Sequence, residues 1–91
     1  MPDAIKIMIV EDDTAVREGL AALINGSEGY ECRHACSSAE LALEQIPDYM
    51  PDVVLMDIHL PGMNGIECVV CLKNAYPEIQ VMMLTVFDNT E

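Results

Sequence analysis

One stretch near the middle of the chain limits what the rest can fold into. Four consecutive apolar residues, Val53 to Met56, lead into a single acid, Asp57, and the chain then turns through Pro61, Gly62 and Gly65. An uninterrupted apolar run bounded by turn residues is typical of a strand that is buried on both faces. Because open parallel sheets bind their ligands beyond the carboxyl ends of the strands, this pattern places Asp57 where a functional group would lie.

Strand and helix patterns alternate along the whole chain. Strands are predicted over Ala4 to Val10, Tyr30 to Cys36, Asp52 to Met56 and Ile79 to Val86. Strict alternation with short links predicts an α/β fold, a doubly wound parallel sheet with helices on both faces. The mixed polarity of the second strand indicates a position at the edge of the sheet.

Three helices are predicted between these strands from apolar residues at helical spacing. The first is capped by Asp13 or Thr14, ends near Asn25 and Gly26, and has Val16, Leu20, Leu23 and Ile24 as its core face. The second opens with a capping box, Ser37-Ser38-Ala39-Glu40, has a stripe of Ala39, Ala42, Leu43 and Ile46, and is closed by Pro47. The third opens at Asn64 and has Ile66, Val69 and Leu72 as its core face.

Charge and hydropathy exclude several classes of function. The 91 residues include 16 acids against four basic residues, a formal net charge of −12, whereas direct nucleic-acid binding needs a basic surface. No apolar run approaches the roughly 20 residues of a membrane span, and no cleavable signal opens the chain. We therefore expect a soluble, cytoplasmic domain.

The spacing of its four cysteines, Cys32, Cys36, Cys68 and Cys71, allows zinc, but their place in a strand and a helix favours reduced thiols.

A second group of acids also follows an apolar strand. If the strands that end at Val10 and Met56 are neighbours, Glu11, Asp12 and Asp57 converge, and two carboxylates about 4 Å apart repel by roughly 4 kcal/mol. Such a cluster suits Mg²⁺, and a carboxylate can itself attack phosphorus to form an acyl phosphate. The Thr85 hydroxyl, near the end of the next strand, is placed to hydrogen-bond a phosphoryl oxygen.

Each of these residues also has a purely structural explanation. Acids after the first strand are favoured by the macrodipole at the N-terminus of the following helix. Asp57 can be a turn residue before Pro61, and Thr85 an ordinary β-branched strand residue. Three strand ends that point to one edge of the sheet favour the functional interpretation.

Four segments together resemble the receiver domain of bacterial two-component response regulators. They are Ile-Met-Ile-Val-Glu-Asp-Asp, Val-Arg-Glu-Gly-Leu, Leu-Met-Asp-Ile-His-Leu-Pro-Gly-Met-Asn-Gly-Ile-Glu and Met-Leu-Thr-Val-Phe. The residues of the second and fourth segments resemble those of the response regulators that carry a helix-turn-helix DNA-binding output domain. The resemblance implies the flavodoxin-like order 2-1-3-4-5, of which this chain would supply 2-1-3-4.

The resemblance also implies roles for individual residues. Asp57 matches the phosphoacceptor that takes a phosphoryl group from a sensor histidine kinase, and Thr85 matches the hydroxyl that moves toward that group. Asp12 matches the acid that binds Mg²⁺ directly, and Glu11 its partner acting through water. The third protein ligand to Mg²⁺ would be the backbone carbonyl of His59.

The chain departs from the family pattern at its end. It stops at Glu91, so residues 1–91 are expected to be a receiver domain incomplete at its C-terminus, without the fifth strand, the last helices and the lysine that pairs with the phosphoryl group. The fourth strand would then be an exposed edge, and we expect the chain either to self-associate through this edge or to be marginally folded.

Two other functions are weighed against the phosphoacceptor. A truncated receiver without phosphorylation could act only as a dimerisation or inhibitory module, which the missing lysine favours. A phosphatase with an aspartate nucleophile needs a second acid two residues after Asp57, where this sequence has His59. A non-enzymatic signalling domain is therefore the leading prediction.

Overall fold

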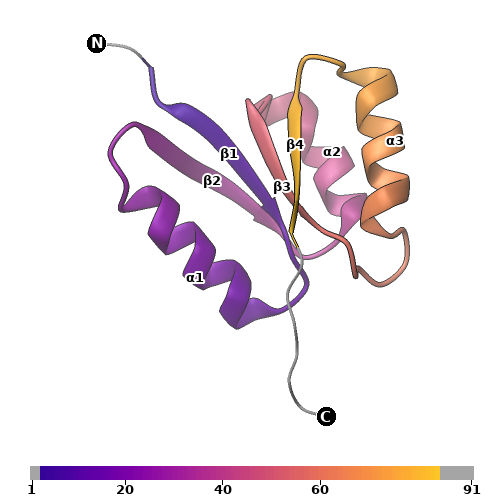
Figure 1. Ribbon diagram of the computed structural model, residues 1–91, viewed down its shortest axis with the longest axis horizontal. Helices are drawn as coiled ribbons and strands as arrows, with labels where there is room; N and C mark the ends of the chain where they lie inside the picture. Colours follow the sequence, from indigo (N-terminus) through magenta and orange to yellow (C-terminus); the bar gives the residue numbers. More distant parts are fainter. Residues whose placement is uncertain (1–2, 85–91) are drawn as a thin grey trace.

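A computed structural model describes residues 3–84, which form a four-stranded sheet and three helices (Figure 1). The elements are β1 (Ile5–Val10), α1 (Thr14–Asn25), β2 (Tyr30–Cys36), α2 (Ala39–Tyr49), β3 (Val53–Asp57), α3 (Gly65–Ala75) and β4 (Gln80–Leu84). Neighbouring strands are parallel throughout, in the order β2-β1-β3-β4. The predicted α/β class, parallel sheet and strand order are confirmed.

The helices lie on both faces of the sheet, with α1 on one side and the α2–α3 pair on the other (Figure 1). The buried core is largest on the α2–α3 side; it includes Met8, Val10, Ala42, Ile46, Val54, Met56, Cys68 and Leu72. Because side chains alternate along a strand, Ile7 and Ile9 face α1 instead. No helix within residues 3–84 is long and apolar enough to cross a membrane.

The predicted core face of α1 is partly wrong. The α1 residues that are at least half-buried are Val16, Arg17, Leu20, Ala21 and Ile24, whereas Leu23 is 69% exposed. The buried face of α1 is thus shifted toward Arg17 relative to the predicted core face. The predicted cap at Asp13 is confirmed, since its carboxylate accepts a hydrogen bond from the Val16 N–H at 3.0 Å.

The start and end of α2 also differ from the prediction. Ser38 caps the helix alone, accepting from the Leu41 N–H at 3.2 Å, so the predicted capping box is wrong. The helix does not stop at Pro47 but continues to Tyr49, which is buried. The Tyr49 hydroxyl accepts from the Arg33 N–H at 3.3 Å, and the ring packs on His34 at 4.7 Å between centroids. These contacts with β2 hold the last turn of α2 beyond the proline.

The capping box of this protein lies at α3. Asn64 accepts from the Glu67 N–H at 2.9 Å, and Glu67 accepts from the Asn64 N–H at 3.2 Å. The buried face is Gly65, Cys68 and Leu72, with Val69 partly buried, so the prediction for Ile66, which is 62% exposed, is wrong.

The fourth strand is an edge of the sheet that residues 3–84 form. One side of β4 pairs with β3, from Val53 opposite Gln80 to Asp57 opposite Leu84. Its centre exposes Met82 by 59% and Met83 by 44%. The predicted continuation of this strand to Val86 lies outside the described residues.

Two leucines test where the core of this domain lies. Leu72→Ala should lower the free energy of unfolding by about 3 kcal/mol, because Leu72 is completely buried between α3 and the sheet. The matched Leu23→Ala should change it by less than about 0.5 kcal/mol, because Leu23 is mostly exposed. Urea denaturation followed by circular dichroism measures both, and similar losses for the two variants would contradict this core.

Candidate functional site

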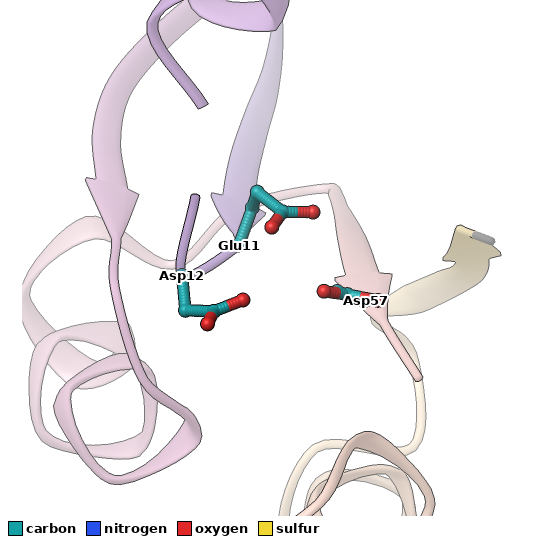
Figure 2. A group of neighbouring side chains, drawn as sticks. All are labelled: Glu11, Asp12 and Asp57. Carbon is teal, nitrogen blue, oxygen red and sulfur yellow. The ribbon is translucent and has the colours of Figure 1, made fainter. Parts of the chain in front are cut away.

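Strand register brings the two predicted groups of acids together. Val10 of β1 pairs with Met56 of β3, so the residues that follow them, Glu11 and Asp57, lie side by side at the carboxyl edge of the sheet. Figure 2 shows the carboxylates of Glu11, Asp12 and Asp57 pointing toward one another. One oxygen from each lies within 4.8 Å of the other two. We call these three residues the acidic pocket.

Two of the three acids are removed from water. Glu11 is 2% exposed and Asp57 is 4% exposed, while Asp12 is exposed. Burial raises the pKa of Glu11, and the neighbouring charge of Asp57 raises it further, although the hydrogen bond from the Asp13 N–H acts in the opposite direction. At an effective dielectric constant near 20, two charges separated by 4.8 Å repel by about 3.5 kcal/mol. The pocket therefore favours a bound cation or a shared proton.

The donor atoms of the pocket fit a hard divalent cation. Glu11 Oε2 accepts from the Asp13 N–H at 2.9 Å, but Glu11 Oε1 is buried and has no hydrogen-bond partner within residues 3–84. A buried oxygen without a donor, beside two further carboxylates, is what a ligand set for Mg²⁺ provides.

The cysteines lie apart from the acidic pocket. All four are free, and none belongs to the cluster of possible metal ligands found in the described part of the chain. Burial raises the pKa of the Cys36 and Cys68 thiols to about 11, which keeps them protonated at neutral pH. The cluster of possible metal ligands found within residues 3–84 consists of carboxylates, so the alternative of a zinc site gains no support here.

The loop after β3 orients Asp57. The His59 N–H donates a hydrogen bond to Asp57 Oδ1 at 3.0 Å, which leaves Oδ2 free of that contact. His59 itself is an exposed residue. Thr85, the remaining predicted site residue, lies outside the described residues.

Two residues support this loop through contacts that sequence reasoning missed. A Cβ atom at Gly65 would lie 2.3 Å from the carbonyl oxygen of Asp57, so α3 can begin against the end of β3 only with glycine there. On the other side, the Glu40 carboxylate accepts from the Met63 N–H at 3.0 Å, a hydrogen bond that lowers the pKa of Glu40. The Pro-Gly-Met-Asn-Gly segment signalled a turn, but it did not show which atoms the turn contacts.

A third missed residue lies beneath the acidic turn. Arg17 Nη1 donates to the backbone carbonyl oxygen of Glu11 at 2.8 Å and lies 3.4 Å from that of Asp12. Its Nη2 donates to the Thr14 hydroxyl at 3.3 Å. The sequence prediction placed this arginine in the first helix, where it lies, but not beside the site.

The parallel sheet defines a doubly wound α/β domain, and the acidic pocket at its carboxyl edge is a group of residues that could hold a metal ion. The sequence pattern of the response regulator receiver domain matches residues 7–91. The chain belongs to this family, the receiver domains of two-component response regulators.

Relatives and solved structures agree with this membership. The chain is 38% identical over 91 residues to protein-glutamate methylesterase/protein-glutamine glutaminase 2 of Paramagnetospirillum magneticum, and 37% identical over 86 residues to transcriptional regulatory protein LnrK of Bacillus subtilis. These matches cover 100% and 94% of this chain but only 26% and 39% of the relatives. A LuxR-family two-component response regulator from Aurantimonas superposes with a TM-score of 0.86 at 30% identity, covering 94% of this chain and 61% of that one. The response regulator domain of Thermotoga maritima CheB gives 0.84 at 27% identity, with 90% and 60% covered.

The close approach at Gly65 leads to a stability prediction. Gly65→Ala should lower the free energy of unfolding by about 1–3 kcal/mol, because the added methyl group forces α3 away from the Asp57 carbonyl. Gly19→Ala is the matched control: this glycine lies inside α1 with nothing within 4 Å of its Cβ position. The control should gain up to about 1 kcal/mol from helix propensity. Urea denaturation distinguishes them, and equal stability of Gly65→Ala and wild type would refute the contact.

Proposed function

We propose that the chain is a phosphoacceptor that takes a phosphoryl group from a sensor histidine kinase onto Asp57. The observation that carries this proposal is a buried carboxylate at the end of β3 that faces two further acids from the end of β1 (Figure 2). Membership of the receiver family supports it.

In the proposed reaction, Asp57 Oδ2 attacks the phosphorus of a phosphohistidine in the kinase. A new bond forms between oxygen and phosphorus, the bond between phosphorus and nitrogen breaks, and the leaving imidazole takes a proton from solvent. The His59 N–H holds Asp57 Oδ1 and so fixes which oxygen attacks. The product is an acyl phosphate on Asp57.

Mg²⁺ is the proposed cofactor, held by Asp12 and Asp57, by the backbone carbonyl of His59, and by Glu11 through water. When bound, this ion supplies positive charge that offsets the repulsion between a phosphoryl dianion and an anionic aspartate. The orphaned Glu11 Oε1 supports the assignment. We further propose that the Thr85 hydroxyl hydrogen-bonds the phosphoryl group.

The proposed consequence of phosphorylation is control of a separate output, most simply DNA binding and transcription. Support comes from relatives such as LnrK, which is named a transcriptional regulatory protein. We propose that residues 1–91 belong to the receiver unit, that they have no enzymatic activity on other substrates, and that their acidic surface does not itself bind nucleic acid. Free cysteines suit a reducing compartment, so we propose that the transfer occurs in the cytoplasm.

A second candidate function rests on the placement of the lysines. Lys6 Nζ lies 5.9 Å from the centre of the Tyr49 ring, and Lys73 Nζ donates to the Ile79 carbonyl at 2.9 Å. Neither contact is with the acidic pocket, where a lysine would pair with a phosphoryl group. A module that associates without being phosphorylated is therefore the alternative.

Phosphorylation of Asp57 is tested with acetyl phosphate and intact mass spectrometry. In the presence of Mg²⁺ the chain should gain the mass of one phosphoryl group, because the small donor replaces the kinase. Chelation of Mg²⁺ should reduce the gain at least tenfold, and Asp57→Asn should abolish it. No gain in folded wild-type protein would reject the phosphoacceptor proposal and favour the association module.

We also propose that the chain associates with a second copy through β4. The Gln80–Leu84 strand contains no charge or proline, the residues that usually protect a sheet edge, and it exposes Met82 and Met83. A twofold axis beside this edge would pair the two β4 strands antiparallel.

Analytical ultracentrifugation tests this association. The wild-type chain should show a concentration-dependent dimer, and Met82→Lys should shift it to monomer, because a charged side chain on an edge strand opposes strand pairing. Leu23→Lys adds the same charge to an exposed leucine on α1 and should leave the dimer unchanged. A wild-type monomer at all concentrations would exclude this interface.

A further inference from the structure

Arg17 occupies a position that helix electrostatics alone would not favour. It is the fourth residue of α1, which begins at Thr14, and so lies near the positive end of the helix macrodipole. The half-buried side chain turns back toward the residues before the helix. A cation in this position needs compensating contacts.

Those contacts are with the backbone of the acidic turn. The guanidinium donates to the Glu11 carbonyl at 2.8 Å, lies 3.4 Å from the Asp12 carbonyl, and reaches the Thr14 hydroxyl at 3.3 Å. Within residues 3–84 it forms no ion pair with a carboxylate. Arg17 therefore bridges the two acidic residues through main-chain atoms and leaves their carboxylate oxygens free.

This bridge opposes a specific strain. The acidic pocket gathers three carboxylates with oxygens within 4.8 Å of one another, and their repulsion drives the Glu11–Asp12 turn away from Asp57. The turn is otherwise held by the Glu11 N–H, which donates to the Cys36 carbonyl at 2.9 Å, and by the Asp13 N–H on Glu11 Oε2. The planar guanidinium holds Nη1 on the two carbonyls and Nη2 on the Thr14 hydroxyl at the same time, whereas a lysine carries all its donors on one nitrogen.

We infer that Arg17 is a positioning residue that holds the Glu11–Asp12 turn in the geometry that binds Mg²⁺. The metal part of this inference rests on the proposed function, but the geometric part does not. In the metal-free protein, Arg17 keeps the Asp13 N–H on Glu11 Oε2. In the metal-bound protein, the same contacts preserve the direction of the Glu11 and Asp12 carboxylates.

The test compares Arg17→Gln and Arg17→Lys with Arg33→Gln. Arg33 is the matched control because its loss changes the net charge equally, while its side chain is 73% exposed and pairs with Glu31 at 3.3 Å. Isothermal titration calorimetry with MgCl₂ gives the affinity. Arg17→Gln should weaken binding by about tenfold or more, Arg17→Lys by a smaller factor, and Arg33→Gln by less than about twofold. Arg17→Lys keeps the charge and aliphatic stem, and provides the measurement if Arg17→Gln does not fold.

A second readout is independent of the metal. In buffer with a chelator, NMR measurement of amide exchange should show the Asp13 N–H exchanging several-fold faster in both Arg17 variants than in wild type or Arg33→Gln. Unchanged Asp13 exchange in folded Arg17 variants would overturn the inference. So would full Mg²⁺ affinity in Arg17→Lys, because charge alone would then suffice. A wild-type chain that binds no Mg²⁺ but shows the Asp13 effect would refute the proposed function and uphold the positioning role.

Discussion

The parallel pairing of β1 with β3 is the constraint on which the rest of the structure depends. The side chains of both strands that face the α2–α3 pair, among them Met8, Val10, Val54 and Met56, are apolar and buried, so the register has little freedom. That register sets Val10 opposite Met56. The residues that follow must then emerge together at one edge of the sheet, and in this chain they are acids.

The acidic pocket consequently contains an unfavourable electrostatic interaction that the surrounding fold holds in place. Carboxylates that repel one another are held together because the strands below them are fixed by burial. Backbone donors stabilise individual oxygens, as the His59 N–H does for Asp57 and the Asp13 N–H does for Glu11. Gly65 lets α3 begin in contact with the Asp57 carbonyl, so the pocket has a rigid wall. A bound cation would offset the electrostatic repulsion among the three carboxylates.

Sequence patterns predicted the elements better than the faces of the helices. The strand and helix order, and the caps at Asp13 and Asn64, follow from local propensities that tertiary contacts did not override. Leu23 and Ile66 were assigned to the core because they lie at helical spacing, but each helix is rotated away from them. In α3 the rotation follows from Gly65, the one residue small enough to meet the Asp57 carbonyl. Pro47 was expected to stop a helix that Tyr49 prolongs through its contacts with β2.

The sequence by itself determined the fold class, the edge of the sheet at which the acids gather, and the identity of the three carboxylates. Each depends on patterns within a few residues: apolar runs, turn residues, and acids at strand ends. Tertiary structure decided which strands are neighbours, how far apart the carboxylates lie, and which distant groups support them. Arg17, Glu40 and Gly65 act through backbone atoms of other segments. Because a backbone carbonyl or N–H carries no residue identity, no sequence pattern can reveal such contacts before the chain is folded.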